Sequence, residues 1–188
     1  MRSRVLPPLA LALALLALVP TFWERTFAAH VAQHLVLNDA VPLLLLPALR
    51  LRLRIHPALA LPPWLADLYL WHAPAPFDAA MRSGPLHWLA HLCLLGFGLL
   101  MWAPLLGRVR TPAWFGTGAR IGYLALMQAG TLVLANVLLW WGTPLYARYG
   151  LHEQRVGGGL LLVEGSVVLV GVLAWLVLGL LREPRDVA

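Results

Sequence analysis

Residues 157–181 read GGGLLLVEGSVVLVGVLAWLVLGLL, an apolar run interrupted by a single carboxylate, Glu164. At a rise of 1.5 Å per residue, a helix of about 20 residues crosses the roughly 30 Å hydrocarbon core of a bilayer. The run is therefore long enough to predict a membrane-spanning helix.

Five further apolar tracts precede this run along the chain. The six predicted spans are Leu6–Trp23, Ala29–Leu49, Leu59–Pro74, Leu86–Leu106, Ile121–Trp141 and Gly157–Leu181. The third is the weakest, because it is short and contains Asp67. We expect an all-α, polytopic membrane helix bundle of about six transmembrane helices. Residues 1–188 would form one helical domain within the lipid bilayer.

The charged residues support this interpretation. They make up 12% of the chain, against roughly 25% in a soluble domain. The net charge is +6, and all 14 basic residues are arginines. They lie in short runs between apolar tracts, a distribution typical of residues that orient a protein in the membrane. We therefore exclude nucleic acid as a partner. The single cysteine, Cys93, cannot form an intramolecular disulfide.

The arginines predict the orientation, because cytoplasmic loops are enriched in Lys and Arg. With six spans and a cytoplasmic N-terminus, ten arginines lie inside and four outside. The inner ones are Arg2, Arg4, Arg50, Arg52, Arg54, Arg108, Arg110, Arg120, Arg182 and Arg185, and the outer ones are Arg25, Arg82, Arg148 and Arg155. Both termini are therefore expected in the cytoplasm.

The first tract, residues 6–23, also resembles a secretory signal or signal anchor. Arg2 and Arg4 precede the apolar stretch, and Thr26-Phe27-Ala28 follows it as a candidate cleavage site. Trp23-Glu24-Arg25 is a poor approach to such a site, so we favour an uncleaved span. Cleavage would leave five spans.

The histidines gather at one predicted face of the membrane. His56 alone falls on the inner side, whereas six histidines fall on the outer side although they are scattered along the sequence. The outer set is His30, His34, His72, His87, His91 and His152. Six histidines at one membrane face predict a common functional site there.

Two H-x-x-x-H pairs indicate that the site binds a metal. Each pair, His30 with His34 and His87 with His91, places two imidazoles about 6 Å apart on one helical face. His72 ends its span at the same level. Neutral imidazole suits copper, zinc and iron, so the ligand type alone does not name the metal.

Two polar residues deeper in the spans are predicted to support these ligands. Asn38 continues the helical stripe of His30 and His34, and Glu164 follows Glu153 on one helical face. For Glu164 a role in packing or in helix hydrogen bonding is an equal alternative. The methionines show no clustered thioether array.

Haem is the main competing cofactor, since two imidazoles can ligate one haem iron. Two histidines one turn apart on one helix cannot reach opposite faces of one haem, which favours a bare ion. One histidine from each helix could still hold a haem, so a b-type cytochrome or quinone-linked redox subunit remains an alternative. A metal-free scaffold or transporter is another. Neither pair has the H-E-x-x-H form of a zinc hydrolase, and we expect no enzyme activity.

Several strings resemble the CtaG family of cytochrome c oxidase assembly factors. They are His30-Val31-Ala32-Gln33-His34-Leu35, Val41-Pro42-Leu43-Leu44-Leu45, Trp71-His72-Ala73-Pro74, Phe77-Asp78, Trp102-Ala103-Pro104-Leu105, Thr143-Pro144-Leu145-Tyr146 and Glu153-Gln154. The resemblance runs from about Ala29 to Gly165.

This resemblance implies a copper-binding protein of the bacterial inner (plasma) membrane that helps to insert copper into subunit I of cytochrome c oxidase from the outer side. An extracytoplasmic copper donor would supply the ion. The implied copper-site residues are His30, His34, His72, His87 and His91, and the residues expected around them include Asp78, His152 and Glu153.

Overall fold

The computed structural model describes residues 6–18, 25–49 and 51–182. Its helices are α1 (Leu6–Ala17), α3 (Phe27–Leu35), η1 (Val36–Ala40), α4 (Val41–Leu45), η2 (Leu46–Ala48), α5 (Pro57–His72), α6 (Pro74–Arg82), α7 (Gly84–Leu105), α8 (Thr117–Trp140) and α9 (Leu151–Arg182). The described ranges contain no β-strand, only one isolated bridge between Arg54 and Arg110.

Four helical segments are long and apolar enough to cross a membrane. They are Phe27–Ala48, Gly84–Leu105, Thr117–Trp140 and Leu151–Leu181. The predicted all-α membrane bundle is thus confirmed. The helices at the other two predicted spans are shorter, with 16 residues in α5 and 12 in α1. The first predicted span continued beyond α1 to Trp23, but residues 19–24 lie outside the described ranges.

Several helix boundaries differ from the sequence prediction by a few residues. Helix α9 begins at Leu151 rather than at Gly157, because its first turn is polar and the hydropathy pattern does not reveal it. Thr26, in the candidate cleavage site, caps α3 by accepting a hydrogen bond from the Ala29 amide at 3.1 Å, and the adjacent Phe27 is fully buried. These residues are therefore part of the folded bundle.

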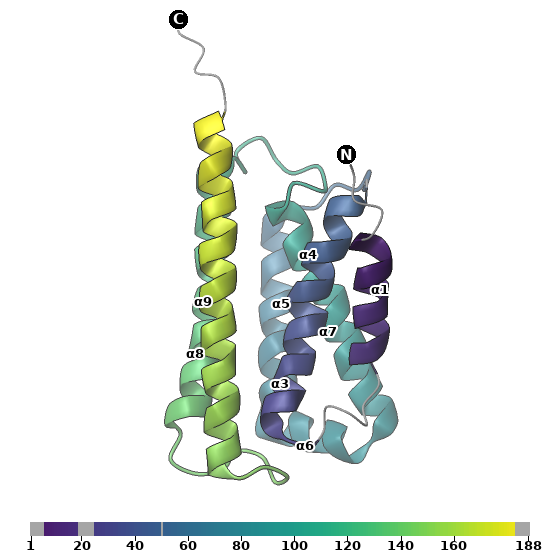
Figure 1. The fold of residues 1–188 in the computed structure, drawn as a ribbon, viewed down its shortest axis with the longest axis vertical. Coiled ribbons are helices and arrows are strands. Elements are labelled where there is room, and N and C mark those ends of the chain that lie inside the picture. Colours follow the sequence, from purple (N-terminus) through teal and green to yellow (C-terminus); the bar gives the residue numbers. More distant parts are fainter. Residues whose placement is uncertain (1–5, 19–24, 50, 183–188) are drawn as a thin grey trace, which may run out of the picture.

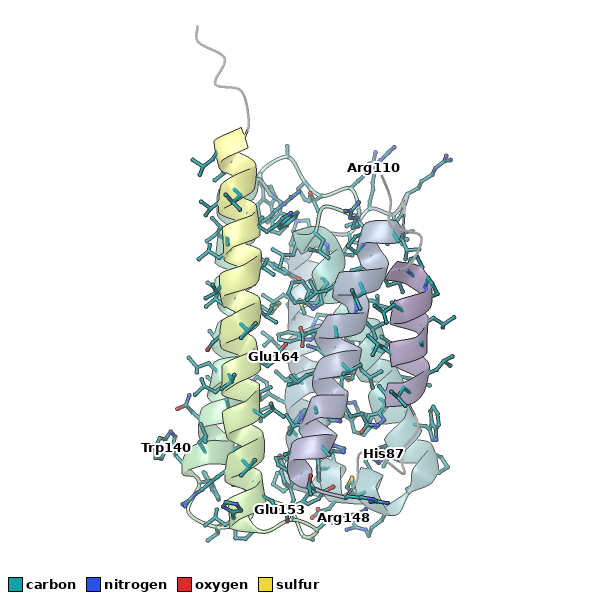
Figure 2. All side chains as sticks on the ribbon, viewed as in Figure 1. His87, Arg110, Trp140, Arg148, Glu153 and Glu164 are labelled. Atoms are coloured by element: carbon teal, nitrogen blue, oxygen red, sulfur yellow. The ribbon has the colours of Figure 1, made fainter. Side chains whose placement is uncertain are left out.

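The helices stand side by side along one common axis (Figure 1). Helices α8 and α9 pair with each other, α3 packs against α9, α4 packs against α1, and α5 packs against α7. Trp64, Trp102 and Met101 are among the fully buried side chains of the core between them. Arg110 lies at one end of the bundle, and His87, Arg148 and Glu153 lie at the other (Figure 2).

A π-helical turn, η1, interrupts the second span and places polar groups in the core. The Trp64 indole N–H donates to Asn38 Oδ1 at 2.7 Å, and Asn38 Nδ2 donates to Asp39 Oδ2 at 2.8 Å. The Trp102 indole N–H donates both to the Asn38 carbonyl oxygen (3.1 Å) and to Asp39 Oδ1 (3.0 Å). Such turns are frequent at functional sites. Here the turn directs two adjacent polar side chains toward the same interior.

Helix α7 approaches this turn closely at Gly98. A Cβ atom added to Gly98 would lie 2.7 Å from the Asn38 carbonyl oxygen and 3.1 Å from the Asn38 Cα atom. Both are backbone atoms, so they cannot rotate away. Glycine is therefore required at this contact.

We predict that Gly98→Ala destabilises the protein by about 1–3 kcal/mol, the usual effect of overpacking. Gly96→Ala is the matched control, because a Cβ atom at Gly96 meets nothing within 4 Å and alanine favours the helix. The stability of each variant is measured as its unfolding midpoint in mild detergent. Equal midpoints for the two variants would contradict the close contact.

Candidate metal centre

Three helices bring five histidines together at one end of the bundle. Helix α3 supplies His30 and His34, α5 ends with His72, and α7 supplies His87 and His91. All five side chains are buried, with exposed fractions between 1% and 9%. The structure therefore places every predicted ligand in one cluster, which we call the histidine cluster.

His34 on α3 and His72 on α5 face each other within this cluster. Their facing nitrogens, His34 Nδ1 and His72 Nε2, are 3.3 Å apart. Two nitrogens bound tetrahedrally to one ion at about 2.0 Å are also separated by about 3.3 Å. The spacing thus fits either a hydrogen bond between the rings or two ligands of one ion.

The main chain fixes the tautomer of His72. Its Nδ1 lies 2.7 Å from the Leu68 carbonyl oxygen, which can only accept, so Nδ1 carries the proton. The lone pair of His72 is then on Nε2 and faces His34. Metal-binding histidines are commonly oriented in this way by a carbonyl group behind the ring.

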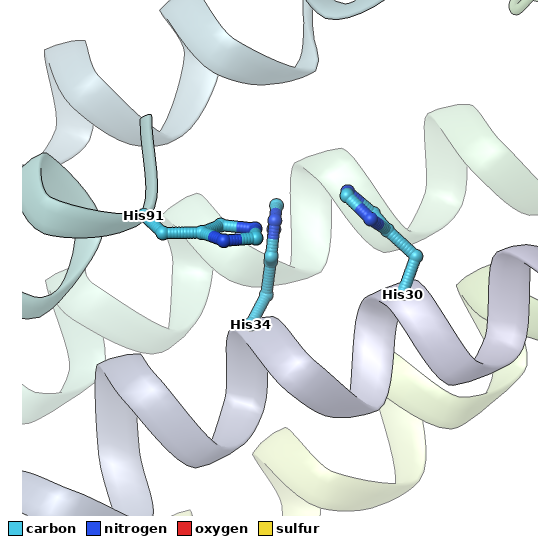
Figure 3. A group of neighbouring side chains, drawn as sticks. All are labelled: His30, His34 and His91. Carbon is cyan, nitrogen blue, oxygen red and sulfur yellow. The ribbon is translucent and has the colours of Figure 1, made fainter. Parts of the chain in front are cut away.

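His30, His34 and His91 form a second grouping within the cluster. One ring nitrogen from each lies within 4.8 Å of the others. Figure 3 shows the His34 ring between the other two. The His87 ring centroid lies 4.3 Å from that of His91 and 5.7 Å from that of His30, so this imidazole adjoins the same grouping.

Some of these nitrogens have no hydrogen-bond partner within the described part of the chain. They are both ring nitrogens of His30 and Nε2 of His91. A buried polar group without a partner costs about 1–3 kcal/mol, so such groups usually have a further role. Coordination of an ion would satisfy them.

Gln33 is a site residue that the H-x-x-x-H spacing does not mark. Its fully buried side-chain amide donates to the Ala17 carbonyl oxygen at 2.6 Å and lies 3.5 Å from His91 Nδ1. This amide links α1 to the histidine cluster. It also restrains the rotation of the His91 ring.

Two small cavities flank His34. One, of about 30 Å³, is also lined by His72, Asn38, Asp39 and Glu164. The other, of about 10 Å³, is lined by His30, His87, His91 and Met81 together with His34 and aromatic and aliphatic neighbours. Volumes of this size hold a water molecule or an ion.

Glu164 and Asn38 thus line the same cavity as His34 and His72, and the Asn38 side chain forms hydrogen bonds with Trp64 and Asp39. Met81 adds a thioether next to the imidazoles. A single methionine carries no sequence signal of this kind, because only a cluster of thioethers indicates a soft metal site.

An aromatic layer covers the histidine cluster toward the nearby end of the bundle. Phe27, Phe77, Tyr146 and Tyr149 pack together, with the Phe77 and Tyr146 rings stacked at 4.0 Å. The Tyr146 hydroxyl donates to the His72 carbonyl oxygen at 3.0 Å.

The connection between α8 and α9, residues 141–150, carries the two tyrosines and is fixed by nearby carboxylates. Asp78 accepts from the Ala147 amide at 3.1 Å, and Glu153 accepts from the Gly150 amide at 3.2 Å. Burial, together with the negative charge of Asp78, raises the pKa of the Tyr146 hydroxyl. The Tyr146 phenol therefore stays protonated and remains a donor at neutral pH.

The remaining predicted residues lie elsewhere. His152 was expected in an outer loop beside the ligands, but it lies in the first turn of α9 and is exposed. Asp78 and Glu153 use their carboxylates to order residues 141–150 rather than to support a histidine ring. His56 caps the opposite end of α5, as expected for a histidine outside the site.

We predict that diethyl pyrocarbonate modifies the exposed His56 and His152 at least about tenfold faster than the five buried histidines, since modification of a buried ring requires local opening. Peptide mass spectrometry of the protein in mild detergent measures each rate. Tyr146→Ala should accelerate modification within the cluster but not at His56. Rapid modification of His34 and His91 in the wild type would show that the cluster is open.

Comparison with known proteins agrees with the resemblance noted in the sequence. No curated protein and no solved structure gave a significant match. A family model described as cytochrome c oxidase caa3 assembly factor matches residues 48–183, which include His72, His87 and His91 but not the two histidines of α3. Because this match covers most of the chain, the protein belongs to the Caa3_CtaG family of cytochrome c oxidase assembly factors.

Proposed function

We propose that this chain binds a copper ion at the histidine cluster and transfers it to subunit I of a haem-copper cytochrome c oxidase during assembly. The observation that carries the proposal is the burial of five imidazoles from three helices in one cluster inside the bundle. Imidazoles in such surroundings are unfavourable unless they are paired or bind an ion.

A bare ion fits the site better than haem does. The two cavities beside the histidines measure about 30 and 10 Å³, far too little for a porphyrin ring. Neutral imidazole binds copper well, and the Met81 thioether beside the rings suits cuprous copper. These features favour a copper carrier over a b-type cytochrome.

The histidines differ in depth, which supports an order of transfer. On α3 and α7 the first histidine of each pair, His30 or His87, lies one turn nearer the end of the bundle than His34 or His91. The copper ion is held by the deeper imidazoles, moves to the outer ones, and then exchanges them for the histidines of the oxidase. Ligand exchange of this kind requires an open coordination position rather than a closed site.

Transfer also requires the aromatic layer to move. Tyr146 and Phe77 cover the histidine cluster, and the Tyr146 hydroxyl donates to the His72 carbonyl oxygen. Docking of a copper donor or of the oxidase displaces residues 141–150 and exposes His30 and His87. The chain thus carries copper without catalysing a reaction.

The arginine distribution supports transfer on the outer side of the inner membrane. Arg54 and Arg110 belong to the arginine-rich loops at the end of the bundle opposite the histidine cluster. Arginine-rich loops face the cytoplasm. The histidine cluster then faces the extracytoplasmic side, where a copper donor and the copper site of the oxidase are accessible, and both termini lie inside.

We predict that His34→Ala and His91→Ala each weaken copper binding by at least about 100-fold, since the loss of even a supporting residue costs 10- to 100-fold at metal sites. His56→Ala and His152→Ala are the controls and should bind copper as the wild type does. Elemental analysis and chelator competition on protein purified in mild detergent measure the difference. Copper bound equally by all four variants would exclude this site.

The same variants test the assembly role in cells. When the chain is replaced by His34→Ala, purified oxidase should contain less copper in subunit I, whereas the His152→Ala control should give fully metallated oxidase. A Soret band in the purified chain would instead favour a redox subunit. Normal oxidase copper with a metal-free chain would indicate a scaffold.

A further inference from the structure

The end of the bundle opposite the histidine cluster holds two arginines side by side. The Ile55 amide donates to the Arg110 carbonyl oxygen at 3.1 Å, and the Arg110 amide donates to the Leu53 carbonyl oxygen at 2.9 Å. These bonds pair Arg54 with Arg110 in a parallel bridge. Side chains of paired residues in such a bridge leave the backbone on the same face, so the two arginines place their positive charges on one side of this end of the bundle.

This pair of like charges lacks a counter-charge in the described part of the chain. Asp78 and Glu153 order the loop at the histidine end, whereas Asp39, Asp67 and Glu164 lie on the spanning helices within the bundle. Adjacent like charges are destabilising by themselves. An anionic ligand would remove the repulsion.

The two arginines border a groove that is built to receive such a ligand. The groove has an open volume of about 730 Å³, and its polar lining comes from Arg54, Arg110, His56 and Thr111. The Leu59 side chain also lines it and is 71% exposed. The groove therefore combines positive charge with an exposed apolar wall.

The surroundings place this groove at the level of the membrane surface. It lies where α5 begins, at the opposite end of that helix from His72. Trp114, 59% exposed, lies against His56 with ring centroids 5.6 Å apart, and exposed tryptophans are typical of the lipid headgroup region. A ligand here would have its charged group in the groove and its apolar part beside Leu59.

We propose that this groove binds the phosphate headgroup of an anionic phospholipid, with Arg54 and Arg110 as its ligands. Arginine forms strong, bidentate hydrogen bonds with phosphate. Basic pockets between spanning helices bind anionic headgroups in the same way. The exposed Leu59 wall favours a lipid over free phosphate, which has no apolar part.

The test measures binding of dioleoylphosphatidylglycerol to the full chain in mild detergent, by titration of the unfolding midpoint and by native mass spectrometry. Dioleoylphosphatidylcholine and inorganic phosphate at equal concentrations are the comparison ligands. We expect phosphatidylglycerol alone to raise the midpoint of the wild type. The double variant Arg54→Gln with Arg110→Gln should weaken the binding of phosphatidylglycerol about 30-fold. Each arginine at a membrane surface contributes about 1 kcal/mol to the binding of an anionic lipid, and the variant removes two of them.

The double variant Arg82→Gln with Arg155→Gln is the matched control, because it removes two exposed arginines at the histidine end. It should bind phosphatidylglycerol as the wild type does, and so should Arg54→Lys with Arg110→Lys within a few fold. Equal loss in both glutamine variants would show only a general charge effect and overturn the site. Equal stabilisation of the wild type by phosphatidylcholine or by inorganic phosphate would also overturn it, even if a glutamine variant failed to fold.

Discussion

The close approach of His34 to His72 is the contact on which the rest of the histidine cluster depends. It joins α3 to the end of α5, and the Leu68 carbonyl group behind His72 fixes which nitrogen faces inward. Among the described residues, the buried imidazoles face mainly each other, since Phe27, Phe77 and Tyr146 separate them from the end of the bundle. Buried imidazole nitrogens that lack a protein partner are unfavourable, and this cost is what the proposed ion would remove.

The π-helical turn below the cluster supports this arrangement. It directs Asn38 and Asp39 toward Trp64 and Trp102, so the second span is held from both α5 and α7 by indole hydrogen bonds. The histidines one and two turns earlier are thereby fixed in rotation and depth. The cavity of about 30 Å³ between this polar layer and His34 is also lined by Glu164, so polar side chains lie directly below the cluster.

The sequence predicted the fold class and the shared face of the histidines, because both follow from hydrophobic length and from the alternating direction of successive spans. It also predicted that His56 lies apart from the cluster. It did not predict the π-helical turn, which depends on tertiary contacts with Trp64 and Trp102 rather than on local pattern. Met81 and Tyr146 reach the site through packing between separate elements, and Gln33, although next to His34 on α3, lies outside the H-x-x-x-H spacing that marks the histidines. His152 was placed in a loop because the polar first turn of α9 has no hydropathy signal.

If imidazoles from separate helices share one copper ion, X-ray absorption spectroscopy of the copper-loaded chain in mild detergent should detect them. We expect at least two imidazole nitrogens at about 2.0 Å from the copper, with the outer-shell scattering that identifies histidine rings, and a reduced imidazole count in a His34→Ala sample. A copper environment of oxygen atoms alone, or one unchanged by that substitution, would contradict a shared ion.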